Sequence, residues 1–171
     1  MRLSNCALTF NMAAARLTGE LVVNGRREYF NACAGAGGRA GSTTPGAVNA
    51  ELMNNPFATH VKGVESGGHI VKVGGPLPLG IYRLKTHETK PYWIRLEPLP
   101  GTNLKGRDGG FAIHRRGPVG SIGCIVPSDS NIVIRLYNVL SEIEDEELPA
   151  PWVNVVAEGS DMDRLLKVRI V

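Results

Sequence analysis

The sequence predicts a mostly β protein, a β-sandwich or β-barrel that carries one or two short helices. The chain has 171 residues, and its 21 glycines and 11 prolines indicate many turns. Short apolar runs typical of strands recur between those turns, whereas only one stretch shows a clear helical period. A chain of this length is most simply one domain, residues 1–171, and is long enough to bury a hydrophobic core.

The expected strands fall into two blocks and a closing pair, and we expect mostly antiparallel pairing. The first block has strands near residues 6–10, 20–24 and 28–33. A glycine-rich loop follows, and then a polar, Asn-rich stretch from about 42 to 60 with room for a short helix. The remaining strands are expected near residues 69–73, 80–85, 92–97, 111–114, 122–126, 152–157 and 165–170.

The clearest helix signal lies between Asp129 and Ile143. Apolar residues recur there on one face of a helix, at Ile132, Leu136, Leu140 and Ile143. Ser128 or Asp129 can cap the N-terminus. The acidic run 142–147 is unfavourable near a helix C-terminus, so the helix is expected to end there and the run to form a solvated loop.

Composition and charge exclude several classes of function. The hydrophobic fraction of 43% and charged fraction of 20% are ordinary for a globular protein, and the net charge of +3 is small. The basic residues form no run interleaved with aromatics, which argues against nucleic-acid binding. No segment approaches the roughly 20 apolar residues that span a membrane. Polar residues interrupt the N-terminal stretch, so we expect synthesis in the cytoplasm without a signal peptide.

One segment carries a candidate cysteine active site. The apolar run 111–113 leads to His114, a loop with Gly117, Pro118 and Gly120 turns the chain, and Ser121-Ile122-Gly123 leads to Cys124. A thiol becomes a useful nucleophile when a nearby imidazole accepts its proton. The loop is short enough to place both side chains on adjacent strand ends. The backbone N–H groups of Gly123 and Cys124 could then stabilise an oxyanion.

These motifs resemble a known family. Ile113-His114 followed by Ser121-Ile122-Gly123-Cys124-Ile125 resembles the signature of the YkuD-type L,D-transpeptidases, which act on the peptide stems of bacterial peptidoglycan. The segment 76–84 resembles the Pro-Xaa-Gly-Xaa-Tyr turn and strand of that family, and 91–96 resembles the strand before its histidine. The likeness covers roughly residues 75–154 and implies a fold of the L,D-transpeptidase type.

Departures from the family pattern point to one branch of it. Ile122 stands where most members have a second histidine, and Val126 stands where an arginine is common. The spacing from His114 to Cys124 is also shorter than in the housekeeping enzymes. These features resemble the antibacterial effectors of the type VI secretion system, which act as L,D-carboxypeptidases and L,D-transpeptidases. The resemblance implies delivery into the periplasm of a target bacterium, stem peptides as substrate, secretion-machinery components and an immunity protein as partners, and no cofactor.

The resemblance also implies a mechanism. His114 raises the thiolate population of Cys124, which attacks the carbonyl between residue three and the D-Ala at position four of a tetrapeptide stem. The D-Ala leaves after protonation by the imidazolium, and the thioester passes to water or to an amine. In this family a backbone carbonyl beside the histidine typically orients the base. Loss of the second histidine is expected to reduce activity or change the acceptor.

Other residues of the candidate site each have an alternative structural role. Ser121 could orient the site by hydrogen bonding or merely support a turn. Arg115 and Arg116 could clamp a substrate carboxylate or simply be solvated, and Tyr92 is a further candidate for substrate binding. His69 could line the cleft, although surface or packing roles are open for His69 and equally for His60 and His87. Metal ligation by His60 and His69 lacks a carboxylate at suitable spacing.

The cysteines and the function leave alternatives open. Cys6 and Cys33 could form a disulfide in an oxidising periplasm, or both could be buried apolar thiols. Cys-Xaa-Xaa-Cys pairs are absent from the sequence, which argues against a structural zinc site. Cys124 and His114 could themselves be structural. Two other function classes are another cysteine peptidase or amidase, and a non-catalytic cell-wall binding module.

Overall fold

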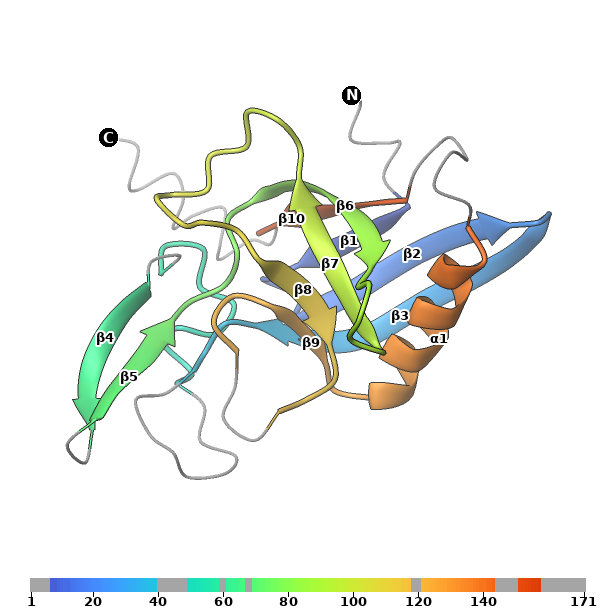
Figure 1. The fold of residues 1–171 in the computed structure, drawn as a ribbon. Helices are drawn as coiled ribbons and strands as arrows, with labels where there is room; N and C mark the ends of the chain where they lie inside the picture. Colours follow the sequence, from blue (N-terminus) through green and yellow to red (C-terminus); the bar gives the residue numbers. More distant parts are fainter. Residues whose placement is uncertain are drawn as a thin grey trace.

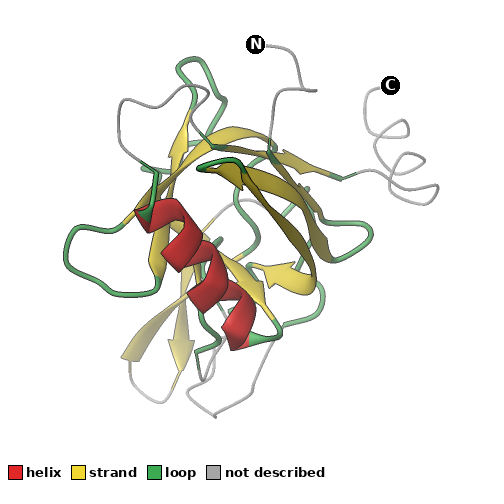
Figure 2. Ribbon diagram, turned by 90° about the vertical axis from the view of Figure 1, so that its right-hand side faces the viewer, coloured by secondary structure: helices red, strands yellow, loops and turns green. Residues whose placement is uncertain are grey.

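The computed structural model describes residues 7–39, 49–58, 61–66, 69–117, 121–143 and 151–157. Its central feature is a closed barrel of eight strands, accompanied by a two-stranded hairpin and one helix (Figures 1 and 2). The mostly β class predicted from the sequence is therefore confirmed, and the barrel rather than the sandwich is the architecture observed.

The barrel strands follow the order β1-β10-β6-β7-β8-β9-β3-β2. Their bounds are β1 Leu8–Asn11, β2 Arg16–Val23, β3 Arg26–Ala36, β6 Gly80–Thr86, β7 Trp93–Pro98, β8 Phe111–His114, β9 Ile125–Pro127 and β10 Trp152–Val156. The separate hairpin pairs β4 (Val61–Ser66) with β5 (His69–Gly74). In Figure 1 it extends away from the barrel.

Two of the neighbouring barrel pairs are parallel, and the others are antiparallel. β1 pairs with β10, which brings the two ends of the described chain together and closes the barrel. β8 pairs with β9 through Ile113 and Ile125. Mostly antiparallel pairing was the expectation, and the parallel β8–β9 contact is an exception that brings the segments of His114 and Cys124 side by side.

The interior of the barrel is a single apolar cluster. Fully buried members come from many strands, among them Phe10, Phe30, Tyr82, Ile94 and Ile113. Burial raises the pKa of the Tyr82 phenol, and its hydroxyl donates a hydrogen bond to the Pro78 carbonyl at 2.7 Å. The phenol is therefore held neutral in the core, and it ties the turn before β6 to the barrel.

The helix α1, Ser130–Ser141, lies within the predicted range and is capped as expected. The Asp129 carboxylate accepts a hydrogen bond from the Asn131 N–H at 2.9 Å, and Glu142 ends the helix. The buried face differs in part from the prediction: Leu136 and Leu140 are buried, but Val133 and Val139 accompany them instead of Ile132 and Ile143, which are only partly buried. The helix contacts β3, β6, β7, β8 and β9.

Several predicted boundaries are corrected by the structure. β3 continues to Ala36, into the segment expected to be a glycine-rich loop, because Ala34, Gly35 and Ala36 pair with β9. Of the stretch 42–60, in which a short helix was considered, residues 49–58 form turns, and 42–48 and 59–60 lie outside the described residues. β4 was not predicted. β9 begins only at Ile125, since Gly123 has a φ of +104° that no strand residue adopts. The strand expected near 165–170 lies outside the described residues.

Cys33 is exposed, so the prediction of a buried thiol at this position is wrong. Its sulfur accepts a hydrogen bond from the Arg16 guanidinium at 3.4 Å. The outward direction follows from the register of β3, in which Ala32 and Ala34 point into the core and the residue between them points out. Cys6, the other half of the considered disulfide, lies outside the described residues.

Candidate active site

The parallel β8–β9 bridge brings the segments of the predicted nucleophile and base side by side in the barrel wall, with the two residues two positions apart along the paired strands. Ile113 and Ile125 are register partners and fully buried. His114 directly follows the first, and Cys124 directly precedes the second. Both flanking residues, His114 and Cys124, are half-buried. The described residues show no direct hydrogen bond between imidazole and thiol, a contact that in free enzymes often tightens only when substrate binds.

A backbone carbonyl fixes the tautomer of His114. The Nδ1 atom lies 2.7 Å from the carbonyl oxygen of Arg115. A carbonyl oxygen can only accept, so Nδ1 carries the proton and donates it. In the neutral imidazole this leaves Nε2 with a lone pair, which is the state that a general base requires. The carbonyl beside the histidine thus occupies the place in which the family resemblance expects the orienting group.

Trp93 holds the plane of the His114 ring. The two residues are register partners across β7 and β8, and their rings stack with centroids 4.4 Å apart and planes 3° apart. The Lys90 ammonium lies 4.9 Å from the centre of the Trp93 ring. The sequence did not single out Trp93. The signal available was its place in the strand before the histidine, but the stacking depends on the strand register.

Burial sets the resting protonation state of the candidate pair. It lowers the pKa of His114, opposed in part by the hydrogen bond to Arg115. It also raises the pKa of Cys124, opposed by a hydrogen bond from the Ala112 backbone, by the charge of Arg107 and by the thiol's own backbone N–H. Both shifts favour uncharged groups. The resting site therefore holds a thiol and a neutral imidazole rather than an ion pair.

If Cys124 and His114 form a catalytic pair, these shifts predict the pH dependence of turnover. Attack by the thiol would require neutral His114, and the pKa of His114 lies below the ordinary 6.5. We therefore expect kcat/KM to be half-maximal at a pH below 6.5 and to be lost only as the pH falls further and the imidazole becomes protonated. Alkylation of Cys124 by iodoacetamide needs the thiolate, so its rate should still be rising at pH 9.0, the ordinary pKa of the thiol. A rapid alkylation plateau below neutral pH would reveal an ion pair and contradict this assignment.

Gly123 is required by both conformation and space. Its φ is +104°, and a Cβ atom placed there would lie 2.6 Å from the Arg107 guanidinium and 2.9 Å from the Phe111 ring. Its carbonyl accepts a hydrogen bond from the Leu77 N–H at 3.1 Å. The residue therefore turns the chain tightly just before Cys124. Oxyanion stabilisation by the N–H groups of Gly123 and Cys124 stays a prediction.

Ser121 contacts the backbone that carries the nucleophile. It is 5% exposed, and its hydroxyl donates to the Cys124 carbonyl at 2.7 Å. The same hydroxyl accepts a hydrogen bond from the Gly37 N–H at 3.1 Å. These contacts link the turn at Cys124 to the end of β3. Of the two roles considered from the sequence, these bonds fit an orienting role exerted through the backbone.

Replacement of Ser121 by alanine tests this role. The change removes the hydrogen bond to Cys124 and leaves the buried Gly37 N–H unsatisfied, so we expect a loss of about 1–3 kcal/mol in the free energy of unfolding. We also expect a clear fall in the alkylation rate of Cys124. Ser128→Ala is the matched control, because its hydroxyl bonds the Cys33 carbonyl at an exposed position. Equal effects of the two substitutions on alkylation would contradict an orienting role for Ser121.

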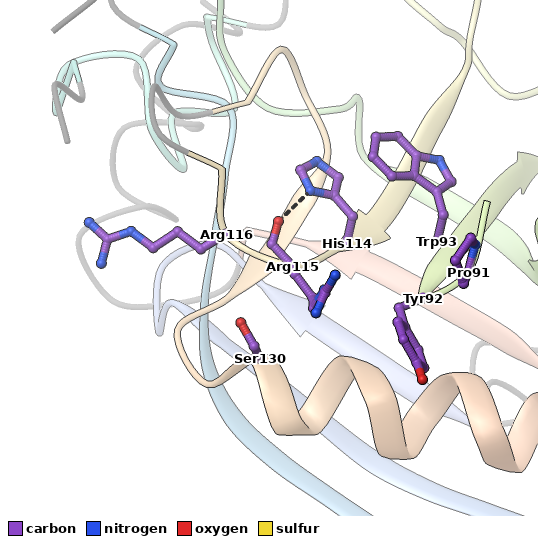
Figure 3. Close-up of a pocket in the computed structure, with 7 residues that line it drawn as sticks. All are labelled: Pro91, Tyr92, Trp93, His114, Arg115, Arg116 and Ser130. Atoms are coloured by element: carbon purple, nitrogen blue, oxygen red, sulfur yellow. Dashed lines mark hydrogen bonds between the residues drawn. The ribbon is translucent and has the colours of Figure 1, made fainter. Parts of the chain in front are cut away.

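A cavity of about 360 Å³ adjoins the imidazole on the Trp93 side (Figure 3). The residues that line it are Pro91, Tyr92, Trp93, His114, Arg115, Arg116 and Ser130. It therefore brings together three predicted substrate-binding residues, Tyr92, Arg115 and Arg116. The Arg115 guanidinium lies 5.3 Å from the centre of the Tyr92 ring, whereas Arg116 extends away from both aromatic rings. Cys124 does not line this cavity.

The remaining histidines do not join this group. His69 begins β5 and pairs with Ser66 at the turn of the hairpin, which lies apart from β8 and β9 in Figure 1. His87 accepts hydrogen bonds from the Thr89 and Lys90 N–H groups and stabilises the turn before β7. His60 lies outside the described residues.

The described ranges contain neither a metal-binding cluster nor a membrane-spanning helix. No cluster of three or more histidine, cysteine, aspartate or glutamate residues in these ranges could hold a metal ion. Nor does the described part of the chain contain a helix of sufficient length and apolarity to cross a membrane.

Comparison of the chain with protein-family models, with curated proteins and with solved structures finds no match in any of the three.

Proposed function

We propose that the protein is a cysteine-dependent L,D-carboxypeptidase or L,D-transpeptidase that acts on the tetrapeptide stems of peptidoglycan. The observation that carries the proposal is the β8–β9 bridge: an imidazole one position after Ile113 and a half-buried thiol one position before Ile125 flank it, and the imidazole is oriented by the Arg115 carbonyl. The choice of substrate rests on the motif resemblance alone. The two statements therefore need separate tests.

The proposed reaction begins with proton transfer from the Cys124 thiol to Nε2 of His114. The sulfur attacks the carbonyl carbon between residue three and D-Ala, and a tetrahedral intermediate forms with its negative charge on oxygen. The imidazolium then returns its proton to the D-Ala nitrogen, the C–N bond breaks, and a thioester remains. Water or an amine, deprotonated by His114, attacks the thioester and frees the thiol.

The cavity beside His114 suits the leaving group. D-Ala carries a free carboxylate, and Arg115 and Arg116 supply cationic partners at the wall of the cavity. Since His114 also lines this wall, a leaving group held there would lie next to the acid that must protonate its nitrogen. Binding of the D-Ala carboxylate in this cavity is part of the proposal.

Product analysis tests the chemistry. Purified tetrapeptide muropeptides are incubated with the protein and followed by mass spectrometry, and the expected product is a tripeptide stem or a stem with D-Ala exchanged for an added D-amino acid. A matched stem ending in L-Ala should remain intact. Cleavage at a different amide would favour a general cysteine peptidase or amidase, and unchanged stems would favour a non-catalytic binding module.

We further propose that the protein is an antibacterial effector injected into the periplasm of a target cell by a type VI secretion system. Expression in a bacterium with a periplasmic leader should then cause lysis or rounding, while cytoplasmic expression should not. Cys124→Ala in the periplasm should be harmless if toxicity arises from catalysis. Equal toxicity in both compartments would contradict the proposal, because the assembled peptidoglycan lies outside the cytoplasm.

A further inference from the structure

Arg107 reaches the turn before the nucleophile from a loop distant in sequence. Its Nη2 atom donates to the Ile122 carbonyl at 2.6 Å, two residues before Cys124. Its Nη1 atom donates to the Pro76 carbonyl at 2.9 Å and to the Gly75 carbonyl at 3.3 Å. One guanidinium thus joins the segment before β6 to the turn that carries the thiol.

The packing around this guanidinium is close. The Arg107 guanidinium is stacked over the Phe111 ring, 4.6 Å from the ring centre. Because Gly123 has no side chain, there is space for this guanidinium beside it. Burial lowers the pKa of Arg107, yet arginine keeps its charge throughout the accessible pH range. A permanent cation therefore lies against the residue adjacent to Cys124.

We propose that Arg107 is the positioning residue for the nucleophile: it fixes the 121–124 turn and supplies the positive charge that stabilises the Cys124 thiolate once His114 takes the proton. The inference rests on the proposed function only in assigning Cys124 a nucleophilic role. When the Cys124 thiol is deprotonated, the proton moves from sulfur to Nε2 of His114, and Arg107 neither gains nor loses a proton.

Other charged groups near the thiol are few among the described residues. His114 approaches from the end of β8. Tyr82, on β6, interacts electrostatically with Arg107, and its raised pKa keeps it neutral. Arg39 bonds Ser121 through its backbone N–H at 3.0 Å. Of these groups, only Arg107 is identified as a charge that lowers the pKa of Cys124, against the effect of burial.

The test measures thiol chemistry and needs no peptidoglycan substrate. Arg107→Gln keeps an amide donor but removes the charge, whereas Arg107→Lys keeps the charge but loses the planar fork. Both should lower the melting temperature, since each loses carbonyl contacts. Alkylation of Cys124 by iodoacetamide near neutral pH, followed peptide by peptide in a mass spectrometer, should slow about tenfold in the Gln variant. The Lys variant should stay within about threefold of the wild type, and the exposed Cys33 is the internal control.

Equal alkylation rates in the two variants would overturn the electrostatic part of the proposal. If neither variant folds, the wild type answers the question by NMR. The Arg107 guanidinium resonances should shift as Cys124 titrates, and the shift should vanish in Cys124→Ser. Arg107 guanidinium resonances that do not shift as Cys124 titrates would overturn the proposal. None of these experiments uses stem peptides. If Arg107 stabilises the Cys124 thiolate but the protein does not process stem peptides, the proposed function is rejected and this inference stands.

Discussion

Cys124→Ala is expected to abolish release or exchange of D-Ala from tetrapeptide stems, with a loss of about 10⁴-fold or more. In covalent catalysis the nucleophile forms the intermediate, and when it is removed only the contribution of substrate binding and oxyanion contacts remains. The alanine side chain is smaller than the thiol and uncharged, so the fold should persist. The measurement is mass spectrometry of stems incubated with each protein, together with the circular dichroism spectrum of the variant.

The chain offers a matched control for this substitution. Cys33 is an exposed cysteine on β3, and its replacement by alanine should leave turnover unchanged. When the amine acceptor is withheld, the wild type should accumulate a mass increase on the Cys124 peptide if transfer to the amine is faster than hydrolysis, and should release the tripeptide stem if hydrolysis is fast. Full activity of Cys124→Ala would reject the cysteine mechanism, whatever the substrate proves to be.

Signals that are local in sequence predicted their elements well. The period of apolar residues around Leu136 and the capping carboxylate of Asp129 both act within one helix, and α1 follows them closely. The prediction of β8 succeeded because the run from Phe111 to His114 is apolar and bounded by glycine. The adjacency of His114 and Cys124 was inferred from loop length. The β8–β9 pairing brings their two segments side by side, and the meeting of the two side chains stays a prediction.

Features that arise from long-range pairing could not be predicted from local sequence patterns. The barrel closes because β1 pairs with β10, for example Leu8 with Val153. No local sequence pattern predicts this parallel contact between the two ends of the described chain. Arg107 lies in a glycine-rich loop, where an arginine is ordinarily solvated. Its role depends on carbonyl groups supplied by two distant segments. Trp93 likewise acquires its stacking partner only through the register of β7 with β8.

Gly123→Ala adds one methyl group to the candidate site and is expected to lower the stability of the protein strongly. A φ of +104° is strained for a residue with a Cβ atom, at a cost of about 1–3 kcal/mol. The new methyl group would also lie 2.6 Å from the Arg107 guanidinium and 2.9 Å from Phe111, so the arginine must withdraw from its carbonyl partners. The free energy of unfolding, measured by urea denaturation, should fall by at least the strain cost.

The same substitution separates positional precision from stability. Displacement of the turn by about 1 Å moves the thiol relative to His114, and misplacement on that scale reduces turnover about 10²-fold. Gly117→Ala is the matched control, because it lies in the same loop and a Cβ atom there meets nothing within 4 Å. We expect Gly117→Ala to retain wild-type stability and turnover. If Gly123→Ala also retained wild-type stability and turnover, the tight turn would not position the nucleophile. The hydrogen bond from Arg107 to the Ile122 carbonyl would then have no role in turnover.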